Sequence, residues 1–142
     1  MMATVREILK GKPDVYAVRP DDAVCHALQL MAEKNIGAVL VTSGDEIQGV
    51  FSERDYARRA ALDAHPSRDT AVRSLMTTDV VSIDPTTTVD ACMSLMTEKR
   101  IRHLPVVEGG RVVGVVSIGD VVRAVVEEQR FTIRSLEHYV TS

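Results

Sequence analysis

The chain has 142 residues, of which 45% are hydrophobic and 26% charged, and its 20 acidic and 17 basic side chains leave a formal net charge of −3. This composition is typical of one globular domain of ordinary size, or of two small halves joined tightly. The acidic balance argues against a broad binding surface for nucleic acid or anionic membranes. No apolar stretch approaches the ~18 to 20 residues of a membrane span. The first residues lack the apolar core of a secretory signal, so we expect a cytoplasmic protein.

The first half of the chain alternates short apolar runs with helical patterns. TVREIL predicts a short helical turn, VYAV a short strand before Pro20, and residues 24–34 a helix with one apolar face, because apolar residues recur there at helical spacing. AVLV and IQGVFS, separated by SGDE, have the spacing of a β-hairpin. ERDYARRAAL then predicts a second helix.

The second half repeats this order. A shift of 65 residues places Asp14–Arg58 on Asp79–Arg123 without a gap, and 16 of these 45 positions are identical. AVRSLM repeats the opening turn, VVSI the strand before Pro85, LPVV and VVGVVS the hairpin, and IGDVVRAVVEEQ the last helix. The sequence therefore predicts an α+β protein of two tandem β-α-β-β-α repeats packed through their sheets with pseudo-twofold symmetry. We place the repeats at residues 1–65 and 66–126, and a helical tail at residues 127–142.

The two cysteines are expected to be core thiols. Cys25 and Cys92 lie in the amphipathic runs of the two halves, on or near the apolar side. No CxxC or HxxxH spacing is present, so we expect no metal site. A disulfide between them is not expected in a reducing compartment.

The sequences GVFSERD and GVVSIGD carry the chemistry that most suggests a ligand. Each stands where a strand leads into a helix, and a helix start favours an anion such as a phosphate. Ser52 and Ser117 add a hydroxyl there, while Asp55 and Asp120 carry carboxylates that accept hydrogen bonds from vicinal ribose hydroxyls. The pair of motifs suggests a nucleoside ligand.

A purely structural interpretation explains the same residues. A serine followed three residues later by an acid at a helix start is also a capping box, although such boxes prefer Glu or Gln to Asp. A cap does not by itself explain the glycine three residues before each serine. Arg54 is a candidate phosphate contact in the first copy, and Gly119 replaces it in the second, so the two motifs are not equivalent.

The tandem units, the strand motif IRHLPVV and the repeated G-x-x-S-x-x-D pattern resemble a pair of CBS domains, a Bateman module, over nearly the whole chain. The resemblance is strongest from Lys99 to Asp120 and weaker in the first copy, where Leu40 replaces the usual proline. It implies a regulatory protein without catalytic activity, similar to small standalone CBS pairs. It also implies adenosine-containing ligands (AMP, ADP, ATP, NAD(H) or S-adenosylmethionine) in clefts between the paired repeats.

The resemblance also implies a set of site residues. Asp55 and Asp120 would hold ribose hydroxyls, with Ser52 and Ser117 beside the ribose or phosphate. Each cleft would be completed by the other repeat. The residues expected around Asp120 are Lys12, Tyr16, Ile36 and Gly37, those expected around Asp55 are Thr77, Val81, Ile101 and Arg102, and Arg102 and His103 resemble a basic pair facing phosphate.

Three functions remain open at this point. The first is a nucleotide-sensing module that forms a homodimer and regulates a separate, unidentified protein, with apolar tail residues such as Phe131, Ile133, Leu136 and Tyr139 in a dimer or partner contact. The second is a ligand-free structural dimer in which the serines and aspartates are only helix caps. The third is an enzyme that uses His103, although no catalytic motif accompanies this residue.

Overall fold

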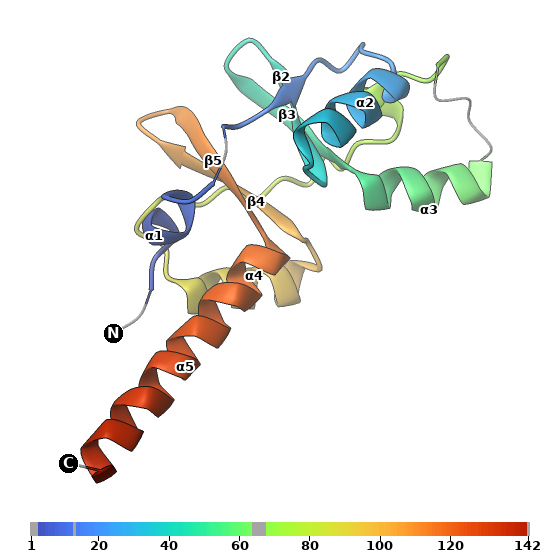
Figure 1. Ribbon diagram of the computed structural model, residues 1–142. Coiled ribbons are helices and arrows are strands. Elements are labelled where there is room, and N and C mark those ends of the chain that lie inside the picture. Colours follow the sequence, from blue (N-terminus) through green and yellow to red (C-terminus); the bar gives the residue numbers. More distant parts are fainter. Residues whose placement is uncertain (1–2, 13, 64–67, 142) are drawn as a thin grey trace. The chain divides into compact units, whose positions relative to one another are not determined.

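The computed structural model describes residues 3–12, 14–63 and 68–141, which fold into two compact units. Residues 14–81 form the first, called the Asp55 unit, and residues 1–13 together with 82–142 form the second, called the Asp120 unit. Each combines a small sheet with helices, as Figure 1 shows, so the predicted α+β class is confirmed. Within the described ranges, no helix is long and apolar enough to cross a membrane.

The Asp55 unit is built on a three-stranded sheet in the order β1-β2-β3. β1 pairs with β2 in parallel, and β2 pairs with β3 as the predicted antiparallel hairpin. The unit's elements are β1 (Ala17–Val18), α2 (Val24–Lys34), β2 (Ala38–Ser43), β3 (Glu46–Ser52), α3 (Glu53–Asp63) and the 3-10 turn η1 (Val72–Ser74).

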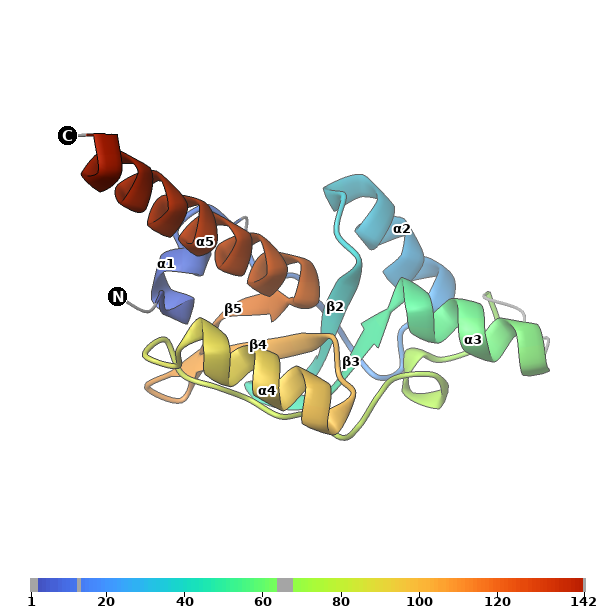
Figure 2. The same cartoon turned by 90° about the horizontal axis from the view of Figure 1, so that it is seen from below.

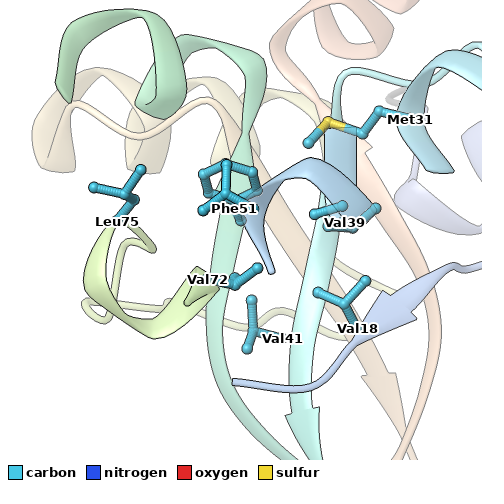
Figure 3. Packing of buried hydrophobic residues seen from close by; sticks show 9 residues of the cluster. Val18, Met31, Val39, Val41, Phe51, Val72 and Leu75 are labelled. Carbon is cyan, nitrogen blue, oxygen red and sulfur yellow. The ribbon is translucent and has the colours of Figure 1, made fainter. Parts of the chain in front are cut away.

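The core of the Asp55 unit lies between this sheet, α2 and η1. Met31, on the apolar face predicted for α2, is buried with Phe51 of β3 and Val72 of η1. Figure 3 shows these side chains gathered with those of Val18 and Val39. Burying such residues is the main favourable term in folding, and it fixes the sheet edge at which α3 begins.

The Asp120 unit is built on the predicted hairpin of the second copy. Its elements are α1 (Val5–Leu9), α4 (Val89–Lys99), β4 (His103–Glu108), β5 (Arg111–Ser117) and α5 (Ile118–Thr141). The tail expected at residues 127–142 is not a separate element, because α5 continues through it without a break to Thr141 (Figure 1). No Pro or Gly interrupts residues 120–141, so nothing in the sequence stops the helix earlier.

The segment that leads each sequence repeat packs on the other repeat's hairpin. α1, at the start of the chain, contacts β5 and α5 of the Asp120 unit (Figures 1 and 2). Backbone bonds hold it there, because the amide of Val5 donates to the carbonyl of Thr87 at 2.9 Å and that of Arg6 to the carbonyl of Pro85 at 3.0 Å. In the Asp55 unit, Thr77 takes the corresponding place beside Val50, with backbone bonds of 2.8 and 2.9 Å in both directions. The boundaries of the compact units therefore differ from those of the sequence repeats: residues 1–13 belong to the Asp120 unit, and residues 66–81 belong to the Asp55 unit.

The second copy lacks the strand predicted at VVSI. There, Ile83 makes only an isolated parallel bridge to Val106. In the first copy, the amide of Leu40 donates to the carbonyl of Tyr16 at 3.1 Å and extends the parallel pairing. Pro105 occupies the position of Leu40 in the second copy and has no amide hydrogen, so the equivalent bond cannot form.

The helix ends also differ from one copy to the other. Thr88 caps α4, since its side chain accepts from the amide of Ala91 at 3.1 Å. α2 begins after Ala23, which has no side-chain cap. Both helices end in a left-handed residue, Asn35 with φ of 54° and Arg100 with φ of 55°.

Candidate functional site

Both copies of the serine-aspartate motif form a reciprocal capping box where a strand leads into a helix. In the first copy, the amide of Ser52 donates to Asp55 Oδ2 at 2.9 Å, and the amide of Asp55 donates to Ser52 Oγ at 3.1 Å. The corresponding distances between Ser117 and Asp120 are 2.8 and 3.2 Å. The structural interpretation is therefore correct as a description of local geometry. It also fixes each carboxylate, so the cap and a ligand contact are compatible.

The carboxylate of Asp55 is held by neutral donors. Oδ2 accepts from the amide and the hydroxyl of Ser52, both at 2.9 Å, and Oδ1 accepts from the hydroxyl of Thr77 at 3.1 Å. An ionised carboxylate has about four acceptor positions, so these three bonds leave capacity for a further donor. Asp55 is half-buried and Ser52 is buried.

The carboxylate of Asp120 is held by two cations. Oδ2 lies 2.5 Å from Lys12 Nζ and accepts from the amide of Ser117 at 2.8 Å, while Oδ1 lies 2.7 Å from a guanidinium nitrogen of Arg123. The Lys12 ammonium also donates to the carbonyl of Val115 at 2.8 Å. The side chain of Asp120 is only 7% exposed.

These contacts set the protonation of Asp120. Burial alone would raise the pKa of this carboxyl, because it disfavours the charged form. The hydrogen bonds from Lys12 and Ser117 and the charge of Lys12 outweigh burial, so the pKa is lowered from its ordinary value. Asp120 is therefore ionised near neutral pH and compensated by its own neighbours.

Lys12 and Thr77 occupy equivalent positions in the duplicated sequence, 65 residues apart, as do Asp55 and Asp120. Each side chain contacts the aspartate of the other sequence repeat: Lys12, which precedes the first repeat's strand, bonds to Asp120, and Thr77, which precedes the second repeat's, bonds to Asp55. The same position of the segment that precedes each repeat therefore supplies a cation, Lys12, to the Asp120 motif and a hydroxyl, that of Thr77, to the Asp55 motif. This is the physical origin of the difference between the two sites.

Packing of the exchanged leaders accounts for the glycine of each motif. A Cβ atom at Gly49 would lie 2.6 Å from the carbonyl oxygen of Thr77 and 2.9 Å from the sulfur of Met76. At Gly114, it would collide with the side chain of Leu9. The close approach of the segment after η1 to β3 therefore requires glycine at position 49, and that of α1 to β5 favours glycine at position 114, without any ligand.

The remaining predicted residues are divided between the two units. Tyr16 and Ile36 are partly buried against the core of the Asp55 unit, and the Lys34 ammonium lies 5.3 Å from the centre of the Tyr16 ring. Gly37 belongs to the same unit, and its carbonyl accepts from the amide of Glu53, the first residue of α3, at 3.1 Å. Val81 is half-buried in that unit, and Arg54 is exposed on α3.

The Asp120 unit contains the basic pair. The carbonyl of Arg102 accepts from the amide of Ile118 at 2.9 Å, which places it beside the start of α5, while its side chain is exposed. His103 begins β4 opposite Ser117 and is half-buried. Ile101 is half-buried at the end of the turn after α4, and Gly119 is the second residue of α5.

Arg123 was not predicted as a site residue, although it makes one of the two ion pairs of Asp120. The sequence carries a signal for it, because residues three apart on a helix are neighbours and Arg123 follows Asp120 by three. Arg58 occupies the equivalent position in the first copy, on the exposed side of α3.

The family model for the CBS domain matches residues 5–61 and 72–127. The chain belongs to the CBS-domain family. It is a CBS pair, because the two matches coincide with the two halves of the duplication and together cover most of the chain.

Similar proteins include other CBS pairs. The mitochondrial CBS-domain protein CBSX3 of Arabidopsis thaliana is 41% identical over 125 residues, and the match covers 84% of this chain and 61% of that protein. A protein with CBS domains from Burkholderia ambifaria is 48% identical with a TM-score of 0.83, over 89% of this chain and 96% of that structure. The CBS pair of protein MJ0100, in complex with 5′-methylthioadenosine and S-adenosyl-L-methionine, shares the fold at 23% identity and a TM-score of 0.77, over 90% of this chain and 99% of that one.

Proposed function

We propose that this CBS pair is a regulatory module that binds adenosine-containing ligands through its serine-aspartate motifs. The observation that carries the proposal is the carboxylate of Asp55, which is fixed by Ser52 and Thr77 yet retains acceptor capacity. The two hydroxyls of a ribose are suitable donors for such a group. A phosphate attached to the ribose would meet the positive end of α3.

AMP, ADP, ATP, NAD(H) and S-adenosylmethionine all carry the ribose that the aspartate would recognise. The complex of the MJ0100 CBS pair with two adenosine derivatives supports this class of ligand. Selection among these compounds rests on groups outside the ribose. Two exposed cations lie near the helix starts: Arg54 is the second residue of α3, and the backbone of Arg102 is bonded to Ile118, the first residue of α5.

The proposed role is regulatory rather than catalytic. A bound ligand changes the population of two conformations only by its differential affinity for them. A separate protein that distinguishes the two conformations would convert this difference into a signal. The cytoplasm remains our prediction for the place where this occurs.

We also propose that the pair forms a homodimer through α5. Along this helix, six residues at alternating spacings of four and three follow the heptad pattern of a coiled coil, and all of them except Gln129 are apolar. Ile133, Leu136 and Val140 are 55%, 61% and 82% exposed, so this stripe is unpartnered in the described chain. The seam comprises Val122, Val126, Gln129, Ile133, Leu136 and Val140.

The seam favours a parallel pair of helices. Val126, Ile133 and Val140 are β-branched and fall at one seam position, which favours two parallel strands. The other seam position holds Val122, Gln129 and Leu136, of which Leu136 matches the same preference. In the parallel alignment, no like charges face each other beside the seam. A full antiparallel overlap would instead place Arg130 against its own copy.

Replacing both Ile133 and Leu136 with Gln tests the dimer. Sedimentation velocity should give a dimer for the wild type and a monomer for the variant, and Arg134→Gln, at an exposed position of the same helix off the seam, should remain dimeric. A wild-type monomer, or a double variant that stays dimeric, would exclude α5 as the interface.

Isothermal titration calorimetry of the purified protein, freed of any nucleotide, tests the binding function. AMP, ADP, ATP, NAD⁺, NADH and S-adenosylmethionine would be titrated separately, and at least one should bind saturably. Asp55→Asn and Asp120→Asn should each weaken binding, whereas Asp45→Asn, in the exposed turn between β2 and β3, should not. Absence of binding for every compound would leave the capping boxes with a structural role alone.

A further inference from the structure

We infer that the two motifs select different ligands: the Asp120 motif requires a phosphate on the adenosine, whereas the Asp55 motif accepts the nucleoside without it. This inference rests on the proposed function and extends it to the specificity of each motif. Lys12 and Arg123 are assigned as the residues that create the phosphate requirement.

In the absence of ligand, the negative charge of Asp120 is already paired with the positive charges of Lys12 and Arg123. Two cations lie within 2.7 Å of its oxygens, so the group of three side chains carries a net charge of +1. Asp120 accepts three hydrogen bonds, as Asp55 does, but two of them come from cations, so the second of two ribose hydroxyls must displace a charged donor. Displacing Lys12, whose side chain is 28% exposed, costs more than displacing Arg123, which is 72% exposed and can turn to solvent.

A phosphate removes this cost. Lysine and arginine bind phosphate through charge-assisted hydrogen bonds, so the displaced cation would exchange one anion for another. The carboxylate would then be released to accept the ribose hydroxyls. Phosphate and ribose would therefore bind together at Asp120, and adenosine alone would bind poorly.

The Asp55 motif lacks this constraint. In the described part of the chain, its carboxylate accepts from Ser52 and Thr77 only, and both are neutral. Arg54 and Arg58 on the same helix are exposed and make no hydrogen bond to Asp55 among the described residues. A ribose hydroxyl can displace or join the hydroxyl of Thr77 without leaving a charge unpaired.

Exchanging the equivalent residues tests the inference. Asp55→Asn leaves only the Asp120 motif intact, and Asp120→Asn leaves only the Asp55 motif. Adenosine and AMP would be titrated into each by calorimetry, and the measured quantity is the ratio of their dissociation constants. Lys12→Thr would be added to the first background and Thr77→Lys to the second.

The ratio should favour AMP at the Asp120 motif by about ten- to a hundredfold more than at the Asp55 motif, as expected for one charge-assisted contact. Lys12→Thr should reduce this preference, and Thr77→Lys should create it. Lys10→Thr, an exposed lysine two residues from Lys12, is the matched control and should change neither. The far-ultraviolet circular dichroism of each variant shows that it has folded.

The outcomes separate this inference from the proposed function. Binding of AMP and adenosine with equal preference at both motifs, or a preference that survives Lys12→Thr and is not created by Thr77→Lys, overturns the inference and leaves the binding function standing. If neither compound nor any other adenosine derivative binds the wild type, the binding function is overturned and the inference with it.

Discussion

A single methyl group added at Gly49 should destabilise the protein far more than the same group added at Gly114. The new Cβ would lie 2.6 Å from the carbonyl oxygen of Thr77, whereas ordinary contact begins at 3.4 Å, so the two atoms must move apart by about 0.8 Å. That carbonyl is backbone and accepts a hydrogen bond of 2.9 Å from Val50. Only movement of the segment after η1 can relieve the overlap.

The expected cost follows from these contacts. Overpacking of this kind costs about 1–3 kcal/mol, and weakening the bond between Val50 and Thr77 adds about 1 kcal/mol. The lower chain entropy of alanine in the unfolded state returns about 0.4–1 kcal/mol. Gly49→Ala should therefore lower the free energy of unfolding by about 1–3.5 kcal/mol.

Gly114→Ala is the matched control. The atoms in its way belong to the Leu9 side chain, which can change rotamer at a cost of about 0.5–1.5 kcal/mol. With the same gain from the unfolded state, the net change should lie between about 0 and 1 kcal/mol. Urea denaturation followed by circular dichroism measures both variants. Equal effects, or a larger loss for Gly114→Ala, would refute the packing explanation of these glycines.

Three further changes follow from local contacts. Because the pKa of Asp120 is lowered in the folded state, its stabilising contribution is present above the unfolded value of about 3.9 and is lost as the pH falls through the folded value. Lys12→Thr removes a cause of that lowering and brings the folded pKa of Asp120 closer to its unfolded value, so urea midpoints measured from pH 7 down to pH 3 should fall less in the variant than in the wild type; identical profiles would contradict the role of Lys12. Arg100→Gly should raise the free energy of unfolding by about 0.5–1 kcal/mol, because glycine adopts a positive φ without steric cost, and a loss of stability would show that the Arg100 side chain matters more. The thiol of Cys92 is fully buried and burial raises its pKa, so it should react with a thiol reagent only in denaturant, and rapid labelling of the native protein at this residue would contradict the packing of α4.

Most of the fold could be predicted because the sequence contains the same pattern of helices and strands in two copies. The spacing of Val24 and Met31, repeated at Val89 and Met96, indicates one apolar face per helix, and both helices form as expected. The hairpins were also predictable, since each pair of apolar runs is separated by turn residues. The absence of a strand at residues 80–83 was not predictable, because it depends on the amide hydrogen that Pro105 lacks. That lack matters only once the pairing partner of this segment is known.

Part of the candidate site was open to sequence reasoning and part was not. The capping geometry of Ser52 and Asp55 follows from their spacing alone. The contact between Lys12 and Asp120 spans 108 residues, and no periodicity in the sequence predicts it. The family resemblance alone suggested that these two residues belong to one site. A cap does not explain the glycine of each motif, and only the folded structure shows what lies beside it: the Thr77 backbone at Gly49 and the Leu9 side chain at Gly114.

A crystal structure with the adenosine compound that binds most tightly would show whether the serine-aspartate motifs hold the ribose. We expect ribose hydroxyls within hydrogen-bond distance of the carboxylate of Asp55, of Asp120, or of both, with the capping bonds to Ser52 and Ser117 preserved. Ligand density away from both aspartates, with their carboxylates unchanged, would contradict it.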